Sequence, residues 1–547
     1  MTSDFSNLTP EQLDKMDKRA LIAIISSLQG QLSAVSNQLN FLTEQIVLMN
    51  QRSFGRKTEK IDQMSHQMSL FEMYDIFNEA EAASDDSKEP DIKEVVISGH
   101  TRKVKTKRED KLEDLPSRIF EYKLNEEVLS DLFPDGYKEL PPETYKRLSV
   151  IPQQFMVDEY HIHVYASKNN DGTIIKAERP ADLFRNSLAT PSLLSLIINN
   201  KFANHLPVER QVKEMKYCGV NLGTNTVSNW MIKASEYYLS HIYDELHSQL
   251  LKGSDVIHAD ETPFEVIQDG RSAGSKSYMW VYRNGACDSK KPIILFDYQP
   301  TRRLDHPEEF LANYNGVVVT DGYQVYHSLE KKREGLMVAG CWVHAKRKFA
   351  ELVKSIGPDK ADGVIAAEAT KKISSIFHED NKLDGLSKSE RKKQRQRTIK
   401  PLVDEFFAWA KEAVLKVPDE SATGRGLQYC INQEQFLRVF LKNGDVPMDN
   451  NLAEQAIRPF TLGRKNWVCI ATPKGAKASA ILYSLVETAK ANNLRLLDYF
   501  EYLLSEMAKH SKDKDLSYIQ DLLPWSKKIQ KEFRIGSKTK KSIINIQ

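Results

Sequence analysis

The chain has 547 residues, which is too long for one ordinary hydrophobic core, so three or four domains are expected. Its 41% hydrophobic and 28% charged residues are typical of a soluble protein, and no stretch approaches the roughly 20 apolar residues of a membrane span. No secretory signal is evident, and the five cysteines are widely spaced, so a reducing cytoplasm is the expected location. The net charge of +2 does not by itself indicate a nucleic-acid binder.

Residues 1–50 are expected to form an N-terminal helix with a continuous heptad repeat. Spacings of four and three alternate between the apolar residues, which predicts a coiled coil through which chains self-associate. A helical hairpin within one chain is the alternative, and the mixed residue types do not fix the number of strands. The heptad residues are Leu21, Ile25, Leu28, Leu32, Val35, Leu39, Leu42, Ile46 and Met49.

Three further segments precede the centre of the chain. Residues 51–116 are basic and then rich in charged residues with few aromatics, which predicts a basic joint and a flexible linker. Residues 117–185 hold short extended runs between prolines and predict a small β-rich module. Residues 186–252 are predicted to be a helical region.

A helix-turn-helix is predicted within that helical region. Gly219 and Gly223 mark a turn, and the helix after it presents Asn225, Ser228 and Asn229 as polar side chains. This pattern is typical of a recognition helix inserted in the major groove of DNA. A helical spacer without DNA contacts is the alternative.

The remainder of the chain predicts an α/β domain built on a mixed sheet with a helical insertion. Three hairpin-type strands are followed by alternating helices and strands. The expected order is the first part of the sheet domain at 253–358, the helical insertion at 359–444, the second part at 445–492, and a helical C-terminal region with a basic tail at 493–547. Within the insertion, a basic run at 391–397 suits either DNA contact or a solvated helix face.

Three acidic residues carry the predicted chemistry. Asp260 and Asp321 each end a run of β-formers, and Glu454 lies in a helical pattern. Carboxylates are the ligands that hard cations prefer, and paired cations can activate both oxygens of a phosphodiester displacement. Two neighbours compete: Glu261 is expected on the opposite face of its strand, and Asp449 is interpreted as a helix-start residue. The sequence therefore predicts a phosphodiester enzyme that depends on Mg²⁺ or Mn²⁺.

Several motifs together resemble the large transposase of the insertion-sequence-66 family over nearly the whole chain. They include His-Ala-Asp-Glu-Thr-Pro at 258–263, Thr-Asp-Gly-Tyr at 320–323, Cys-Trp-Val-His-Ala-Lys-Arg-Lys-Phe at 341–349 and Asp-Asn-Asn-Leu-Ala-Glu-Gln-Ala-Ile-Arg-Pro at 449–459. The resemblance implies a ribonuclease H-like fold and a DDE triad of Asp260, Asp321 and Glu454, which would bind two Mg²⁺ or Mn²⁺ ions. It also implies binding of terminal inverted repeats and target DNA, DNA cleavage and strand transfer, small accessory proteins of the same element, and a bacterial, nucleoid-associated location.

Two features concern zinc. Many members of that family carry paired cysteines in a zinc-finger-like module before the catalytic domain, but this chain has no cysteine before Cys218, so no zinc is predicted there. Cys341 and His344 are spaced like half of a zinc site, but no second pair follows, and no metal is predicted there either. Cys341 is expected to end a buried strand.

Basic residues near the triad are candidates for DNA phosphate contacts. The candidates are His344, Lys346, Arg347, Lys348, Arg458, Arg464 and Lys465. Phosphate contacts hold register rather than read sequence. Two other functions remain open at this point: a structure-selective nuclease on the same fold, and an inactive transposase derivative that regulates by binding DNA.

Overall fold

The structure is a computed structural model that describes residues 18, 19, 21, 22, 24–32, 35, 153–166, 174–179, 181–285, 290–357, 361 and 363–537. The chain divides into two compact units, each described separately below. The first comprises Met1–Asp75 and Tyr243–Glu487, and the second comprises Ile76–Ile242 and Thr488–Gln547. Among the described helices, none combines the length and the apolar character needed to cross a membrane.

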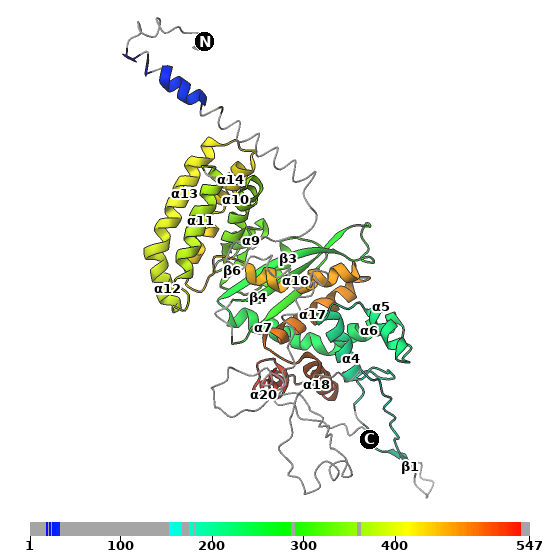
Figure 1. Ribbon diagram of the computed structural model, residues 1–547. Helices are drawn as coiled ribbons and strands as arrows, with labels where there is room; N and C mark the ends of the chain where they lie inside the picture. The colour runs from blue at the N-terminus through cyan, green and yellow to red at the C-terminus, as the bar shows by residue number, and fades with distance from the viewer. Residues whose placement is uncertain are drawn as a thin grey trace, which may run out of the picture. The chain divides into compact units, whose positions relative to one another are not determined.

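A five-stranded mixed sheet lies at the centre of the first unit, as predicted (Figure 1). Its order is β5-β4-β3-β6-β7, with β3, β4 and β5 antiparallel and with β6 and β7 parallel to β3. The parallel strands follow helices α8 (Asp305–Phe310) and α9 (Gln324–Lys332), because parallel pairing needs a crossover connection. The strands are β3 (Val256–Glu265), β4 (Lys276–Asn284), β5 (Ile294–Gln299), β6 (Val317–Thr320) and β7 (Met337–Gly340).

One expectation about the strands is wrong. Asp260 lies in the middle of β3 rather than at its end, because β3 continues through Thr262 and Pro263 while paired to β4. Pro263 has no backbone N–H to donate, and this is tolerated because β6 already ends at Thr320 and does not pair with β3 at this position. Asp321 does follow directly after β6, as predicted.

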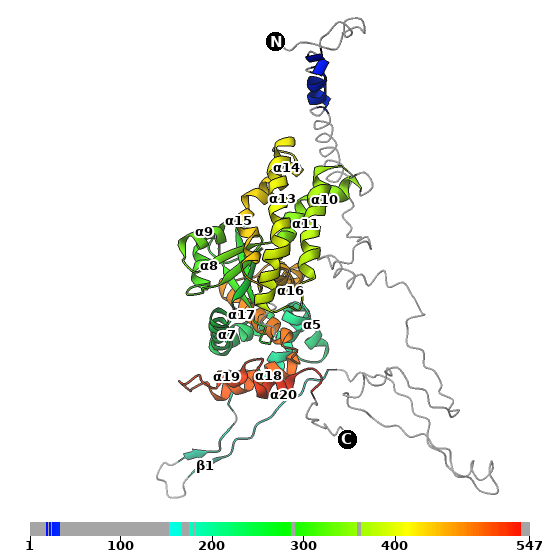
Figure 2. The same ribbon diagram turned by 90° about the vertical axis from the view of Figure 1, so that its left-hand side faces the viewer.

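The helices after β7 share one hydrophobic core with the sheet. This core joins Val256 and Val319 of the sheet to Trp342 of α10 and to Phe406 and Phe407 of α13. Helices α10, α11 and α13 run side by side (Figures 1 and 2). The helices of this part are α10 (Trp342–Ile356), α11 (Ile365–Asn381), α12 (Lys388–Gln394), η8 (Arg395–Ile399), α13 (Lys400–Ala413), η9 (Val414–Lys416), α14 (Ala422–Asn432), α15 (Glu434–Leu437) and η10 (Val439–Leu441).

The basic run at 391–397 contains one residue that is entirely internal. The Arg395 side chain is 0% exposed, and its Nε and Nη2 donate to the two carboxylate oxygens of Asp380 at 2.7 and 2.8 Å. Its Nη1 donates to the carbonyls of Phe440 and Val446 at 2.9 and 2.7 Å. Arg395 therefore neither contacts DNA nor lies on a solvated helix face; it ties three helical segments together.

Two long helices complete the described part of the first unit. Helix α16 (Asn451–Trp467) packs across β3 and β4. Helix α17 (Pro473–Ala491) is joined to the edge strand through Ser484, whose hydroxyl accepts a hydrogen bond from the backbone N–H of Phe296 at 2.7 Å. Helix α16 therefore packs on β3, the strand that holds Asp260, and on the neighbouring strand β4.

The second unit is mainly helical. Helix α4 begins after Thr190, whose hydroxyl accepts from the Leu193 N–H, and α4 packs against α18. The elements are β1 (Val164–Ala166), β2 (Ile174–Lys176), α4 (Pro191–Ile198), η4 (Asn199–Ala203), α5 (Val208–Tyr217), α6 (Thr224–Ala234), η5 (Ser235–Leu239), α18 (Leu496–Lys509), α19 (Ile519–Leu522) and α20 (Lys527–Phe533), while α7 (Ser240–Gly253) leads into the first unit. Of the predicted β-rich module, the described residues contain the antiparallel pair β1–β2, and most of the segment lies outside the described residues.

The N-terminal helix is confirmed where the structure describes it. All described residues from 18 to 35 are helical, and Ile25, Leu28, Leu32 and Val35 are exposed. The remaining heptad residues, Leu39, Leu42, Ile46 and Met49, lie outside the described residues. Self-association through this helix stays a prediction.

Candidate active site

Strand register brings Asp260 and Asp321 to the same level. In the parallel pair β3–β6, Ile257 is opposite Val318 and His258 is opposite Val319. Continuing that register by two residues places Asp321 opposite Asp260. Two aspartates that are distant in sequence are therefore neighbours on adjacent strands.

Helix α16 brings the third carboxylate to the same face of β3. His258 contacts Asn450, and Thr262 accepts a hydrogen bond from Arg464 Nη1 at 3.2 Å, so this face of β3 is turned towards α16. Asp260 lies between these two residues and, because side chains alternate along a strand, points the same way. Glu454 is in the first turn of α16, and its charge raises the pKa of Asp260. Asp260, Asp321 and Glu454 therefore gather at one site.

Asn450 fixes the start of α16 against the sheet. Its Nδ2 donates to the carbonyl of Ala259 at 2.9 Å, and its Oδ1 is 3.0 Å from Nδ1 of His258. Its backbone N–H donates to the Cys341 sulfur at 3.3 Å. All of these groups are buried. Ala259, which precedes Asp260, is therefore bonded directly to Asn450, which lies four residues before Glu454.

A tight turn holds Asp321. The Asp321 Oδ1 accepts the backbone N–H of Tyr323 at 3.1 Å, and its carbonyl accepts the hydroxyl of Tyr429 at 3.0 Å. Gly322 lies between with φ +96°, and a Cβ there would meet the Tyr429 hydroxyl oxygen at 2.9 Å. The turn therefore requires glycine for both its backbone angle and its space.

The electrostatics of the site suit a bound cation. Burial raises the pKa of Asp260 well above its ordinary value, and the charges of Glu261, Asp321 and Glu454 raise it further. The Glu454 Oε1 atom is buried without a hydrogen-bond partner among the described residues. Clustered carboxylates with an unpartnered oxygen are a donor set that a hard divalent cation satisfies. The three residues therefore fit the role of metal ligands.

Two of the predicted DNA-contact residues lie against the triad. On α10, Nδ1 of His344 is 3.6 Å from Glu454 Oε1, and Nη2 of Arg347 is 3.7 Å from Glu454 Oε2. Lys346 is half-buried, which lowers its pKa, and the exposed Lys348 lies over the Tyr429 ring at 5.2 Å. The first turns of α10 therefore place basic groups around Glu454.

The candidates on α16 differ from one another. Arg464 Nη1 donates to the carbonyl of Pro263 as well as to Thr262, so this guanidinium helps to attach α16 to β3. Lys465 is exposed and Arg458 is half-buried. The contact of these residues with DNA stays a prediction.

Cys341, His344 and Glu454 bring one possible ligand atom each within 4.8 Å of one another. The Cys341 sulfur accepts a hydrogen bond from Asn450, and burial raises the pKa of the thiol to about 12. Structural zinc takes four ligands, and among the described residues this cluster offers three. The cluster therefore fits a structural thiol beside a triad glutamate better than a zinc site.

The predicted recognition helix has the expected exposure. On α6, Asn225 and Asn229 are exposed and Ser228 is half-buried, whereas Val227 and Trp230 are buried. Helix α5, the turn at 218–223 and α6 follow one another as a helix-turn-helix would. The polar face is therefore free for a ligand, and its contact with DNA stays a prediction.

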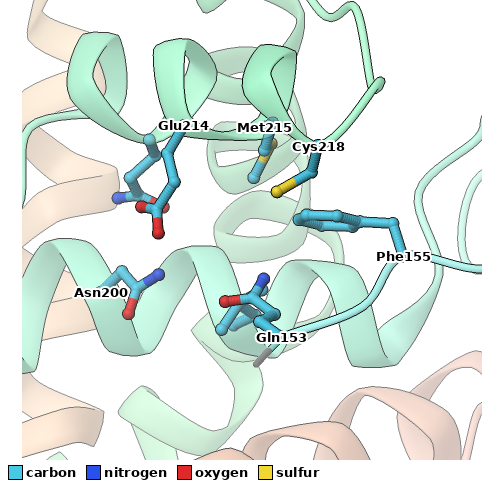
Figure 3. Close-up of a pocket in the computed structure, with 8 residues that line it drawn as sticks. Gln153, Phe155, Asn200, Glu214, Met215 and Cys218 are labelled. Carbon is cyan, nitrogen blue, oxygen red and sulfur yellow. The ribbon is translucent and has the colours of Figure 1, made fainter. Parts of the chain in front are cut away.

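A pocket of about 180 Å³ lies beside α5 in the second unit. Glu214 and Met215 of α5 face Asn200 of η4 across it, and Phe155 of the extended segment lies near Cys218 (Figure 3). The lining residues are Gln153, Phe155, Leu196, Asn200, Gln211, Glu214, Met215 and Cys218. None of the three triad carboxylates is among them, so the pocket is not the site of the predicted chemistry.

Sequence reasoning missed two residues at the site. The motif at 449–459 predicts Asn450 only as part of a helix start, and no sequence pattern singles out Arg302. Arg302 donates through Nε to Glu261 Oε1 at 2.8 Å and lies over the Tyr323 ring at 3.6 Å. The only local signal for Asn450 was its place in the motif at 449–459; Arg302 gave none, because its partners are distant in sequence.

Comparisons with known proteins identify the family of this chain. The description "Transposase IS66 family" matches residues 186–478, "Transposase C of IS166 homeodomain" matches 41–119, and "IS66 C-terminal element" matches 484–525. The uncharacterized proteins y4qI and y4hP of Sinorhizobium fredii are 28% and 27% identical to this chain, over 70% and 71% of each chain. Among solved structures, the Mos1 transposase paired-end complex with left transposon end has 11% identity and a TM-score of 0.12, over 48% of this chain and 81% of that chain. At that TM-score the likeness carries no argument.

The fold, the site and the matched families define a transposase of the DDE class, a DNA-binding enzyme that cleaves and transfers DNA. The chain belongs to the IS66 family of insertion-sequence transposases.

Proposed function

We propose that Asp260, Asp321 and Glu454 are the catalytic triad and hold two divalent cations, Mg²⁺ or Mn²⁺, for cleavage at the element ends and strand transfer to target DNA. The observation that carries the proposal is the register of β3 and β6, which aligns the two aspartates on the face where α16 supplies the glutamate. When bound, such cations lower the pKa of the attacking group and stabilise charge on the phosphate oxygens.

The strand order supports a ribonuclease H-like fold. Three antiparallel strands followed by two parallel ones, with the first strand in the centre, place the aspartates on two adjacent central strands. The helix that bears the glutamate packs across β3 and β4.

The residues of the chain have separate tasks in the proposed reaction. The Tyr323 N–H holds the Asp321 carboxylate, and Asn450 holds β3 and α16 together. His344 and Arg347, both close to Glu454, orient its carboxylate and place positive charge where DNA phosphates approach. The protein therefore supplies a pre-arranged set of ligands rather than a nucleophile of its own.

DNA binding and assembly complete the proposal. The exposed polar face of α6 reads the terminal inverted repeats through Asn225, Ser228 and Asn229. Exposed heptad residues such as Leu28 and Leu32 leave an apolar helix face that a second copy of the chain would cover. Accessory proteins of the same element and association with the nucleoid follow from the family alone.

The test is cleavage and joining of a labelled duplex carrying one end of the element, with Mg²⁺ or Mn²⁺. Asp321→Ala and Glu454→Ala should abolish both reactions, whereas Glu265→Ala, an exposed carboxylate at the end of β3, should not. Cutting without joining would instead favour a structure-selective nuclease. Binding without any chemistry by the wild type would favour a DNA-binding regulator.

A further inference from the structure

Arg302 is held between the two segments that carry the catalytic aspartates. It donates through Nε and Nη2 to Glu261 Oε1, and Glu261 directly follows Asp260. Its guanidinium lies 3.6 Å from the centre of the Tyr323 ring, and the Tyr323 hydroxyl donates to the Arg302 carbonyl at 2.8 Å. The Tyr323 backbone N–H also holds Asp321. One guanidinium is therefore locked to the immediate neighbours of both aspartates.

Part of this guanidinium remains available. The Glu261 side chain is only 2% exposed, but that of Arg302 is 39% exposed. Within the described part of the chain, no protein group accepts from Arg302 Nη1. The Nη1 amino group can therefore donate to a group that approaches from solvent.

A role limited to neutralising Glu261 does not account for this arrangement. Neutralisation needs one contact, yet Arg302 is also stacked on Tyr323, which fixes the plane in which its remaining N–H groups point. Burial alone would lower the pKa of Arg302, but the charge of Glu261 and its hydrogen bond raise it above the ordinary value. A planar, permanently charged group with spare donors suits a phosphate oxygen.

We propose that Arg302 is a DNA-contacting residue of the active site, donating from Nη1 to a backbone phosphate next to the one that reacts, with Glu261 and Tyr323 as its positioning residues. The inference rests on the proposed function, because it takes the triad as the place where DNA reacts. The contact is to phosphate, so it contributes to register and rate without reading sequence.

The first test measures binding of the duplex carrying one element end, in EDTA so that no cleavage occurs, over a range of salt concentrations. The logarithm of the binding constant falls linearly with the logarithm of the salt concentration, and loss of one phosphate contact makes that slope about 0.9 less negative. Arg302→Ala should show this change. The control is Arg303→Ala, which removes the same charge from a side chain that is 74% exposed and whose ion pair within the described residues is with the nearby Asp305.

Arg302→Ala leaves Glu261 buried and unpaired, which can unfold the chain. The double variant Arg302→Met with Glu261→Gln removes both charges and should fold, with the same reduced salt slope. Its cleavage rate in Mn²⁺ should fall about 100-fold, the scale of a substrate displaced by about 1 Å when a positioning contact is lost. Tyr323→Leu keeps Arg302 but removes the ring on which it stacks. This variant should slow cleavage without changing the salt dependence of the binding constant.

The outcomes separate this inference from the proposed function. If the wild type cleaves but the double variant matches Arg303→Ala in slope and rate, then Arg302 is not a phosphate contact. If the folded wild type neither binds nor cleaves the duplex, the proposed function itself fails.

Discussion

Replacing Asn450 by alanine tests whether one buried amide sets the geometry of the triad. The change removes the donor to the Ala259 carbonyl at 2.9 Å and the acceptor 3.0 Å from His258 Nδ1. The Asn450 Oδ1 atom can only accept, so the His258 Nδ1–H donates to it, and burial lowers the pKa of His258 to about 4. Neither partner can turn to solvent, because both residues are buried.

The expected loss of stability follows from these two bonds. A buried polar group left without its partner costs about 1–3 kcal/mol, so two such groups cost about 2–6 kcal/mol. The measurement is the free energy of unfolding from urea titration, with Asn451→Ala as control. Among the described residues, the Asn451 side chain has no hydrogen-bond partner, whereas its backbone N–H donates to Asp449, so a change of this side chain should stay within about 0.5 kcal/mol.

The same variant should lose activity beyond its loss of stability. With the start of α16 no longer tied to β3, Glu454 in the first turn of that helix can shift relative to Asp260, and a displacement of about 1 Å costs about 100-fold in rate. Single-turnover cleavage, measured well below the unfolding temperature of the variant, tests this. Unfolding at the same urea concentration as Asn451→Ala, or cleavage at the wild-type rate, would refute the reasoning.

Three further predictions concern the site and its support. Binding of Mn²⁺ should release protons and should strengthen as pH rises, because the raised pKa of Asp260 makes the cation and a proton compete for its carboxylate. Calorimetry in buffers of different ionisation enthalpy measures the proton release. A Mn²⁺ affinity that weakens with rising pH would contradict the prediction. The free energy of unfolding of the metal-free chain should change with pH in the opposite direction. The proton on Asp260 stabilises the folded state at low pH, and this contribution is lost as pH rises through the pKa of the folded state. Arg395→Met should lower the free energy of unfolding by about 3–5 kcal/mol, and adding Asp380→Leu should restore part of it, because the first change leaves the buried Asp380 carboxylate with Arg391, at 3.2 Å, as its charged partner among the described residues; equal urea midpoints for the single and double variants would count against this. Gly322→Ala should cost about 1–2 kcal/mol in urea unfolding and markedly slow cleavage, whereas Gly335→Ala, also at positive φ, should cost stability alone; equal cleavage rates in the two variants would show that the Asp321 turn is not critical.

Much of the site could be predicted from local sequence. Strand-forming runs precede Asp260 and Asp321, and a helical pattern surrounds Glu454, so the type of element that bears each carboxylate was evident. The mixed sheet followed from three hairpin-type strands and a later alternation with helices. These features depend on residues within a few positions of one another, which is the range over which sequence patterns are informative.

Other features depend on residues far apart in the chain, and only the tertiary structure decided them. Asn450 bonds to Ala259, 191 residues away, and to Cys341, 109 residues away. Arg302 reaches Glu261 across 41 residues, and Arg395 is internal although it lies in the basic run at 391–397. The sequence by itself predicted which carboxylates would serve the reaction and the type of element that bears each of them. Their alignment, and the buried amide and guanidinium that maintain it, depend on packing between elements that no local pattern records.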